Sequence, residues 1–448
     1  MTENDRRSFL KASGVAGTAA LTGLAGCGGN SGGGDNGGSG GSGTSSSSDG
    51  SRQTNVKPFG MVTNLQNDQW KAFASGVQEA ANALGAPASD HKQNEGQQQK
   101  MLSQLSTAFT NGYNAICGTP YQASGVPTVV RKCKENDAGF VDYWNIAKWY
   151  TPLDAGENFI QYQIPAVAET GQLTAEILFE AMGGEGNFVH ITGPHGATGR
   201  NRNMGVENAM EKYPNITKLD MQPGDWSRPS GRQVMSSFVS KYGDKIDGVY
   251  CQNDGMGLGA YTILKNNDMN VPMVGYDGPK DAVNNIKSTS ADGDGPNWVA
   301  SFSAKTFWQG GYAVVEAFDW LNGWRPKTPE RMMWGGGVVV TDDPSKYQGK
   351  TKTDFSASWS KPDEYLNVAY SDGKSPYDWK KASRTLNPDS WDPQNKLVPI
   401  RKQEFNQLNW TESNKPSGYS IPDAYSDSGS FDDAETLYQK QHQTDPYQ

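Results

Sequence analysis

Carboxylate, amide, guanidinium and indole side chains follow successive short apolar runs of this sequence. They are Thr63, Asn67, Gln69, Trp70, Asp142 and Tyr143 in the first half, and Arg202, Trp226, Asn253 and Asp277 in the second. A carboxylate accepts hydrogen bonds from hydroxyl groups, and amide and guanidinium groups donate to hydroxyl oxygens. An indole ring offers a flat apolar face to the C–H side of a sugar ring. These residue types therefore favour binding of a sugar or polyol and require no reacting group.

Each of these residues also has a structural interpretation when it is taken alone. Asp142 and Asp277 could cap helices, Trp70 and Trp226 could belong to the core, and Arg202 could pair with Glu207. Their recurrence decides between the two interpretations, because ligands of α/β proteins gather at the carboxyl ends of strands. Side chains of this kind at five strand ends favour a binding site over isolated structural roles.

The elements that must position these side chains form two series. The first has strands at 59–63, 115–117 and 139–142 and helices at 70–84, 101–109 and 126–135. The second has helices at 167–182, 201–213, 231–242 and 258–265, strands at 187–192, 216–221, 248–251 and 271–276, and a last helix at 307–321. Alternation of strand and helix is typical of a parallel, doubly wound sheet. We therefore predict two α/β lobes with a cleft between them.

Three segments carry a resemblance to a known family. They are the run from Tyr250 to Ala260, the run from Val274 to Gly278, and an Arg200-x-Arg202-x-x-Gly205 pattern. From about residue 59 to 322 the chain resembles the ribose-type, type I periplasmic sugar-binding proteins of ABC transporters. The resemblance implies an α/β fold of two doubly wound lobes with parallel sheets joined by a hinge. It also implies a monosaccharide or polyol ligand, an ABC permease and its ATPase as partners, and neither catalysis nor a cofactor; we expect a monomer.

The resemblance assigns a role to each site residue. Asn67 and Asp142 would hold sugar hydroxyls from the first lobe, with Trp70 on one face of the ring; Arg202, Asn253 and Asp277 would bind from the second lobe, with Trp226 on the other face. Lys305 stands where the family commonly has a hinge glutamine, and Gln69 where a second aromatic residue is common. The family often has Asp-Arg where this chain has Asp142-Tyr143, so one donor is missing or is supplied by Lys305 or Asn145.

The same resemblance predicts discontinuous lobes. Lobe 1 would comprise 55–163 and 306–335, and lobe 2 would comprise 164–305 and 336–350, with crossings near Gln163, Lys305 and Gly336. Residues 351–448 form an extension without a counterpart in the small ribose-binding members. Its tryptophans, Trp359, Trp379, Trp391 and Trp410, are too many for a disordered tail, so we predict an ordered, loop-rich extension.

The N-terminal segment predicts where the protein works. Arg6 and Arg7 precede an apolar stretch, which is typical of twin-arginine export signals, and residues 14–24 are too few to span a membrane. The ending Leu24-Ala-Gly-Cys27 resembles a lipoprotein signal box, so 1–27 would be a signal peptide and Cys27 the lipidated residue. Residues 28–54 would form a disordered tether, because 28–51 contain 19 Gly or Ser in 24 positions. We expect an exported protein with a lipid anchor at the outer face of the cytoplasmic membrane.

Composition excludes other classes of function. A net charge of −9 argues against nucleic acid, which requires a basic surface. Cys117, Cys133 and Cys251 show no metal-type spacing; we interpret them as buried free thiols, with a Cys117–Cys133 disulfide as the alternative. The four histidines, His91, His190, His195 and His442, form no ligand pattern, and we expect no metal.

Two other functions are compatible with parts of the sequence. Gly255-Met-Gly257-Leu-Gly-Ala260 formally matches a dinucleotide-binding motif, with Asp277 ending the next strand, so an exported oxidoreductase is one alternative. Gln252, Asn253 and Asp254 stand between strand and glycines, however, and a carboxylate there would repel a pyrophosphate. The second alternative is a ligand sensor that docks on a receptor, and the sequence does not distinguish it from a transport protein.

Overall fold

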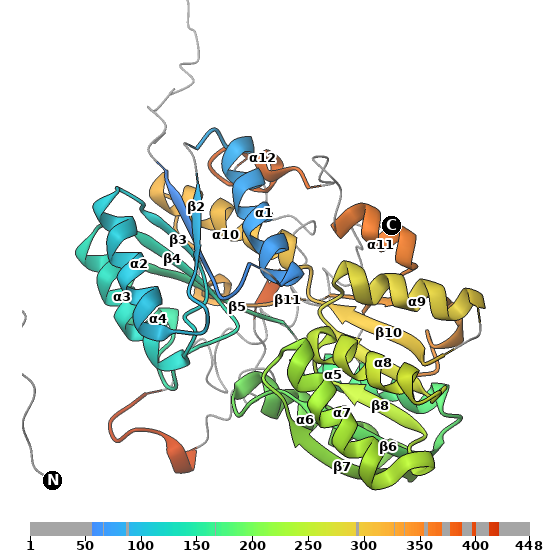
Figure 1. The fold of residues 1–448 in the computed structure, drawn as a ribbon. Coiled ribbons are helices and arrows are strands. Elements are labelled where there is room, and N and C mark those ends of the chain that lie inside the picture. Colours follow the sequence, from blue (N-terminus) through green and yellow to red (C-terminus); the bar gives the residue numbers. More distant parts are fainter. Residues whose placement is uncertain are drawn as a thin grey trace, which may run out of the picture. The chain divides into compact units, whose positions relative to one another are not determined.

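Two seven-stranded sheets with helices beside them dominate the computed structural model (Figure 1). The structure describes residues 56–65, 67–86, 89–165, 167–292, 295–326, 328–335, 337–353, 357–369, 377–387, 397–399 and 412–420. Arg6, Arg7, Cys27, the tether, Gly336, Trp391 and Trp410 lie outside these ranges.

The first sheet, sheet A, has the strand order β14-β11-β5-β4-β3-β1-β2. Its strands are β1 (Pro58–Val62), β2 (Asp90–Gln93), β3 (Ala115–Gly118), β4 (Gly139–Tyr143), β5 (Phe159–Pro165), β11 (Met332–Gly335) and β14 (Leu397–Pro399). All neighbours are parallel except β11 and β14. Every residue of β1, β3, β4 and β5 is buried, as expected for parallel strands covered on both faces. The accompanying helices are α1 (Asp68–Ala83), α2 (Gln98–Thr110), α3 (Val126–Glu135), α4 (Pro152–Ala155) and α10 (Thr306–Leu321).

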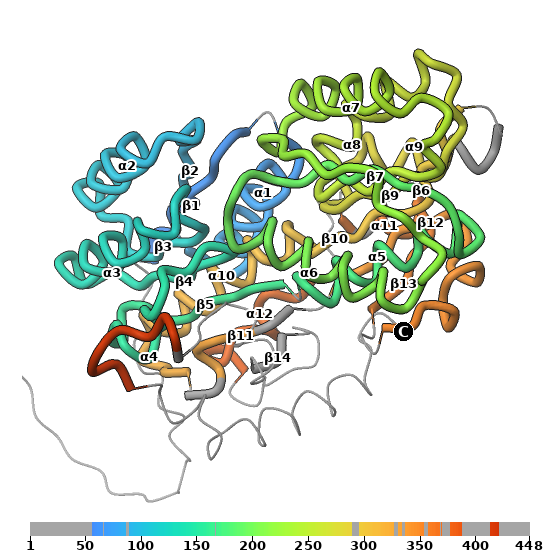
Figure 2. Tube along the Cα trace, turned by 90° about the horizontal axis from the view of Figure 1, so that it is seen from below, coloured from blue at the N-terminus to red at the C-terminus, as the bar shows by residue number. Residues whose placement is uncertain are grey.

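The second sheet, sheet B, has the order β13-β12-β10-β9-β8-β6-β7. Its strands are β6 (Glu185–Thr192), β7 (Asn215–Pro223), β8 (Gly248–Cys251), β9 (Pro272–Tyr276), β10 (Asn297–Ser303), β12 (Val338–Thr341) and β13 (Ser358–Ser360). Only β10 and β12 pair antiparallel. The helices here are α5 (Val167–Ala181), α6 (Ala197–Lys212), α7 (Arg228–Tyr242), α8 (Asp254–Asn266) and α9 (Lys280–Asp292), as Figure 2 also shows. The predicted α/β class with two doubly wound layers is confirmed.

The chain passes between the two sheets at three places. Strand β5 of sheet A leads into α5 beside sheet B, and β10 of sheet B leads into α10 beside sheet A. The consecutive strands β11 and β12 belong to sheets A and B respectively. Two of these passages lie close to Gln163 and Lys305, whereas Gly336, near the third, is outside the described residues. The exact lobe boundaries stay a prediction.

Close packing of α1 on α10 requires a glycine at position 76. A Cβ atom there would overlap the carbonyl oxygen of Phe307, at the start of α10. The two helices are in contact over much of their length, and α10 is buried at most of its positions. The segment that contains Gln69 and Trp70 is therefore fixed against the helix that begins beside Lys305.

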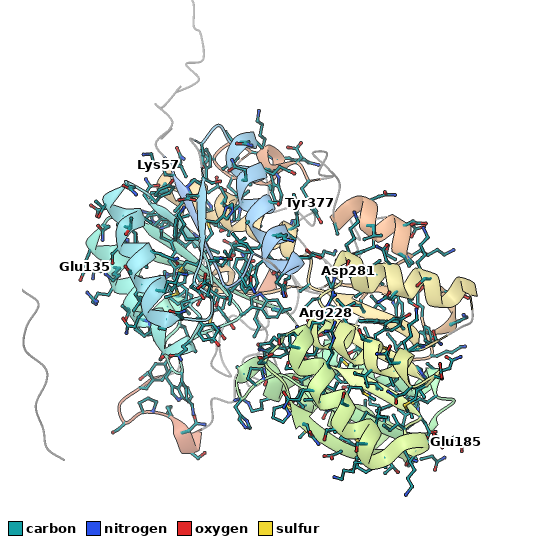
Figure 3. The ribbon with its side chains drawn as sticks, viewed as in Figure 1. Lys57, Glu135, Glu185, Arg228, Asp281 and Tyr377 are labelled. Carbon is teal, nitrogen blue, oxygen red and sulfur yellow. The ribbon has the colours of Figure 1, made fainter. Side chains whose placement is uncertain are left out.

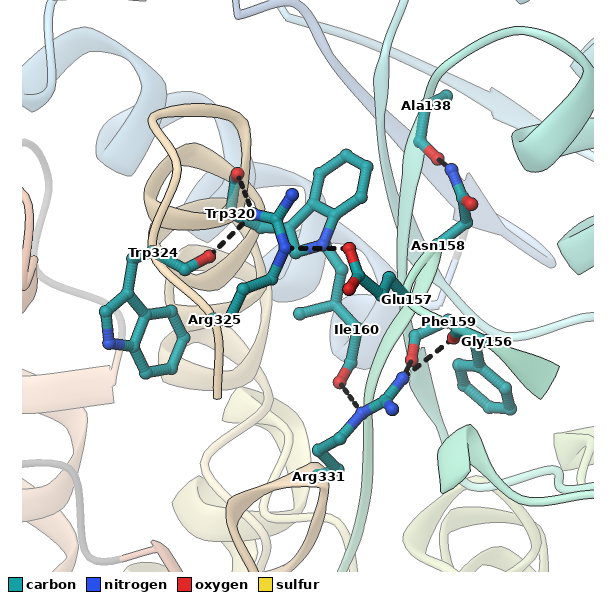
Figure 4. A network of polar contacts seen from close by, with 10 residues as sticks. All are labelled: Ala138, Gly156, Glu157, Asn158, Phe159, Ile160, Trp320, Trp324, Arg325 and Arg331. Atoms are coloured by element: carbon teal, nitrogen blue, oxygen red, sulfur yellow. Dashed lines mark hydrogen bonds and ion pairs between the residues drawn. The ribbon is translucent and has the colours of Figure 1, made fainter. Parts of the chain in front are cut away.

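Two arginines fix the chain where it returns from α10 to sheet A (Figure 4). Arg325 forms an ion pair with Glu157 at 3.0 Å and donates to the carbonyl oxygen of Trp320 at 2.8 Å. Arg331 donates to the carbonyl oxygen of Phe159 at 2.6 Å. These bonds join the segment between α10 and β11 to the start of β5, and β11 then pairs with β5.

The described parts of the C-terminal extension pack on elements of both sheets. Strand β13 extends sheet B through β12, and β14 extends sheet A through β11. Helix α11 (Pro362–Ala369) lies beside α9, and α12 (Trp379–Ala382) lies beside α1 and α10 (Figure 1). Asp319 of α10 accepts hydrogen bonds from the Ser383 hydroxyl and from the backbone N–H of Arg384 and Thr385, at 2.6–3.0 Å.

The three cysteines of the described chain are free and buried. This confirms the first interpretation of Cys117, Cys133 and Cys251, and the alternative disulfide between Cys117 and Cys133 is not formed. Burial raises the pKa of each thiol well above its usual range.

Candidate functional site

The start of α1 holds three of the predicted site residues and gives one of them a structural task. Asn67 is the N-cap of α1, and its side chain accepts a hydrogen bond from the backbone N–H of Gln69 at 2.8 Å. Trp70 lies in the first turn, half-buried, with its ring edge-on to Phe73 at 6.1 Å. The carbonyl oxygen of Thr63, just after β1, accepts a hydrogen bond from the backbone N–H of Glu95 at 2.8 Å.

The end of β4 places Asp142 and Tyr143 in the interior. Asp142 is fully buried, and neither carboxylate oxygen has a hydrogen-bond partner. Burial raises its pKa well above the usual range and outweighs the nearby Tyr143 amide and Thr119 hydroxyl, which lower it. The Tyr143 hydroxyl donates to the carbonyl oxygen of Gln309 in α10, and its ring packs edge-on against Phe73 at 5.6 Å.

Arg202, on α6, is the centre of a buried polar cluster beside sheet B. Its side chain is 2% exposed, and its guanidinium lies 3.4 Å from the ring centre of Tyr276 and 5.7 Å from that of Trp226. It donates a hydrogen bond to the carbonyl oxygen of Gln252. Its charge also lowers the pKa of Asp277, so these two residues from separate strand ends are electrostatically coupled.

Two carboxylates share the single positive charge of Arg202. Asp254 accepts from the N–H of Gly278 at 2.8 Å and from the Ser301 hydroxyl at 2.5 Å. The pKa of Asp254 is raised to about 7 and that of Asp277 to about 8, with burial as the largest cause; the charge of Asp254 contributes to the rise at Asp277. Asp277 is thus a carboxyl group with a strongly raised pKa, and such groups cluster at functional sites.

Backbone geometry at Trp226 and Asn253 completes this cluster. Asn253 is the N-cap of α8: its side chain accepts from the N–H of Met256 and donates to the carbonyl oxygen of Trp226, both at 3.0 Å. Trp226 has a positive φ of 69°, and its ring occupies the space that a side chain at position 193 would need. Gly193 therefore lets the indole ring of Trp226 lie directly against the backbone after β6.

A pocket of about 300 Å³ brings residues of both halves of the chain together. Gln69 lines it from α1, Asp277 from the end of β9, and Lys305 from the residue before α10. Lys305 adopts a left-handed conformation with φ 57°, which turns the chain from β10 into α10. The other predicted site residues do not line this pocket; they are Thr63, Asn67, Trp70, Asp142, Tyr143, Arg202, Trp226 and Asn253.

The sequence-based list missed the contribution of the extension. Trp359 of β13, Glu364 and Tyr365 of α11, and Tyr377 line the same pocket. The number of tryptophans in the extension was the available signal. It indicated that the extension is ordered, but it did not indicate where the extension packs. Figure 3 labels Tyr377, which precedes α12 and stacks on Phe307 with ring centres 6.1 Å apart.

The glycines of the dinucleotide-like motif have packing roles. Helix α8 begins at Asp254, so Gly255, Gly257 and Gly259 lie within it and not in a preceding loop. A Cβ at Gly259 would overlap the carbonyl oxygen of Arg228 in α7. A Cβ at Gly255 would meet the carbonyl oxygen of Trp226, and one at Gly257 would meet the ring of Trp298, so close packing explains all three glycines.

Comparison with protein families gives two matches. The family described as "Periplasmic binding protein domain" matches residues 59–323, which is more than half of the chain. The twin-arginine translocation pathway signal sequence matches residues 3–23, which include Arg6 and Arg7. Within the described residues, no helix combines the length and apolar character that crossing a membrane requires.

Individual relatives are similar over parts of the chain. A xylitol-binding protein of Mycolicibacterium smegmatis is 36% identical over 188 residues, 42% of this chain and 52% of that protein. A ribose import binding protein of Bacillus subtilis is 25% identical over 245 residues, 53% of this chain and 75% of that protein. The chain thus spans about half the length of the first of these relatives.

Solved structures share the fold. A twin-arginine translocation pathway signal protein from Burkholderia phytofirmans superposes with a TM-score of 0.59 at 26% identity, over 64% of this chain and 89% of that one. A periplasmic solute binding protein from Actinobacillus succinogenes with bound D-allose has a TM-score of 0.57 at 20% identity, over 65% and 99%. In both comparisons about a third of this chain has no counterpart.

Proposed function

Since the chain belongs to the periplasmic binding protein domain family, we propose that it is the extracytoplasmic substrate-binding protein of an ABC importer. It would bind a monosaccharide or related polyol and deliver it to a membrane permease, whose ATPase supplies the energy. Its relatives include xylitol-, ribose- and allose-binding proteins, which support this ligand class. No chemical step is part of the proposal.

One observation carries the proposal at the level of residues. Asp277 lies at the wall of a pocket that also includes Gln69 and Lys305, and behind it stand Arg202 and Asn253. A carboxyl group that can accept from hydroxyl groups, beside amide and cationic donors, suits a polyol. We assign ligand contacts to the residues named from the sequence: Thr63, Asn67, Gln69, Trp70, Asp142, Tyr143, Arg202, Trp226, Asn253, Asp277 and Lys305.

Titration calorimetry of the mature protein against pentoses, hexoses and polyols, xylitol included, tests the function. We expect one of them to bind, and Asp277→Asn to weaken that binding at least tenfold, because a carboxyl oxygen that accepts from the ligand is lost. Asp281→Asn is the matched control: Asp281 is exposed and pairs with Arg228 at 2.9 Å (Figure 3). Binding of no sugar or polyol would refute the function, and an unchanged affinity in Asp277→Asn would refute the site.

We further propose that Cys27 carries a lipid that anchors the exported protein to the membrane, with residues 28–54 as tether. The twin-arginine signal supports export, and the small residues before Cys27 support processing at that position. Cys27→Ser should release the protein from cells with its ligand affinity intact. Retention of this variant on the membrane would contradict the anchor.

A further inference from the structure

The C-terminal extension supplies nearly half of the residues that line the pocket beside Asp277. It contributes Ser358, Trp359 and Ser360 from β13, Glu364, Tyr365 and Ala369 from α11, and Tyr377. The family match ends at residue 323, so these residues lie outside the part of the chain that it covers. We propose that the extension forms a second subsite, which holds a ring attached to the sugar bound at Asp277. The preferred ligand would then be a two-ring glycoside, such as a disaccharide or an aryl glycoside; this inference rests on the proposed function.

The position of Asp277 separates the two subsites. The charge of Arg202 and the side chain of Asn253 both act on the carboxyl group of Asp277, and neither residue lines the pocket. Trp359 and Tyr377 lie on the pocket side. Asp277 is therefore the residue that the two groups share, and a ring attached to a sugar held by Arg202 and Trp226 would extend past Asp277 into the pocket beside the extension.

The lining of this space suits a second ring. Trp359 is half-buried, and Phe307 and Tyr377 stack on each other with an interplanar angle of 23°. Aromatic faces bind the apolar sides of sugar or aryl rings, and the Glu364 carboxylate accepts from hydroxyls. At about 300 Å³ the pocket is at the lower end of the roughly 300–1,000 Å³ typical of small-molecule sites.

Contacts of Tyr365 fix the extension to the turn that carries Asp277. The Tyr365 hydroxyl lies 3.1 Å from the carbonyl oxygen of Gly278 and 2.7 Å from the Ser303 hydroxyl. Asp277 and Gly278 both have positive φ, and a side chain at position 278 would clash with the Tyr365 hydroxyl. The wall of the second subsite and the carboxylate of the first are therefore held together.

Calorimetry with the full mature protein tests the subsite. The ligands are the free sugars and polyols of the panel and, for each sugar that binds, its two anomeric phenyl glycosides and its disaccharides. We expect at least one glycoside to bind about tenfold or more tightly than the free sugar. Trp359→Ala should abolish this gain and change the affinity for the free sugar by less than about twofold, whereas Trp359→Phe should keep most of the gain.

Two further variants separate the subsite from general effects on folding. Glu364 is exposed on α11, so Glu364→Gln should fold normally and weaken disaccharides but not phenyl glycosides. Tyr419→Ala, in the same extension but against Trp149, should change neither affinity. If free sugars bind and no glycoside binds more tightly, or if Trp359→Ala weakens both equally, the second subsite is refuted and the function stands. If neither free sugars nor glycosides bind, the proposed function itself fails.

Discussion

Replacing Asp277 with Asn should change how the stability of the ligand-free protein depends on pH. The pKa of Asp277 is raised from 3.8 to about 8 in the folded protein; burial is the largest cause, and the charge of Arg202 offsets only part of the effect of burial. Between about pH 4 and 8 the folded state therefore keeps a proton that the unfolded state has lost. Because folding binds a proton in this window, the free energy of unfolding must fall as the pH rises.

The size of the effect follows from one proton. The slope is about 1.4 kcal/mol per pH unit, so Asp277 alone should lower the free energy of unfolding by about 3 kcal/mol between pH 5 and 7. Asp254 and Glu316, whose pKa values burial raises to about 7, contribute in the same direction. Only the difference between wild type and Asp277→Asn therefore belongs to Asp277.

Urea unfolding at pH values from about 5 to 9 measures this difference. The two curves of stability against pH should diverge up to about pH 8, with the variant the less sensitive, and run parallel above it. Asp281→Asn, which changes an exposed carboxylate in a surface ion pair, should follow the wild type. Parallel curves for wild type and Asp277→Asn from pH 5 to 8 would refute the raised pKa of Asp277.

Three other substitutions test the framework of the site. Gly76→Ala should lower the free energy of unfolding by about 1–3 kcal/mol in urea titrations, because its Cβ meets the carbonyl oxygen of Phe307. Ser75→Ala, on the exposed face of the same helix, should leave the free energy of unfolding unchanged. Asp319→Asn should lower the free energy of unfolding by about 1–3 kcal/mol, because the carboxylate accepts three hydrogen bonds from residues 383–385. The extension should then be the first segment that limited proteolysis cleaves. Protease resistance equal to that of the wild type would contradict this role of Asp319. Arg202→Met should raise the pKa values of Asp254 and Asp277 further, and carboxyl titrations followed by NMR that match the wild type would exclude the coupling.

Periodic segments were predictable from the sequence because local pattern and tertiary environment agree there. The helix expected at 126–135 is α3, and the strands expected at 248–251 and 271–276 match β8 and β9 within one residue. Strand β2 could not be recognised because its residues, Asp-His-Lys-Gln, show no apolar alternation. It is a strand only because it pairs with β1 at the edge of sheet A, which is a tertiary fact.

The candidate site was predictable only where residues follow strands directly. The strand-end rule placed Arg202, Trp226, Asn253 and Asp277 near one another, and the structure brings these four together. It could not anticipate that Asn67 caps α1, because a cap and a ligand donor use the same residue type. The contact of Tyr365 with Gly278 could not be predicted, because the two residues lie 87 positions apart in the sequence.

The attachments of the extension bear on how it would act during ligand capture. Strands β13 and β14 pair with β12 and β11, the consecutive strands that belong to the two sheets. Trp359 and Tyr365 are thereby tied to the sheet that carries Asp277, whereas α12, just after Tyr377, packs on α1 and α10 beside the other sheet. In a two-lobe binding protein a hinge movement changes the distance between such walls. A ring between Trp359 and Tyr377 would therefore contact both walls at once, so the second subsite would favour the closed form as well as add affinity.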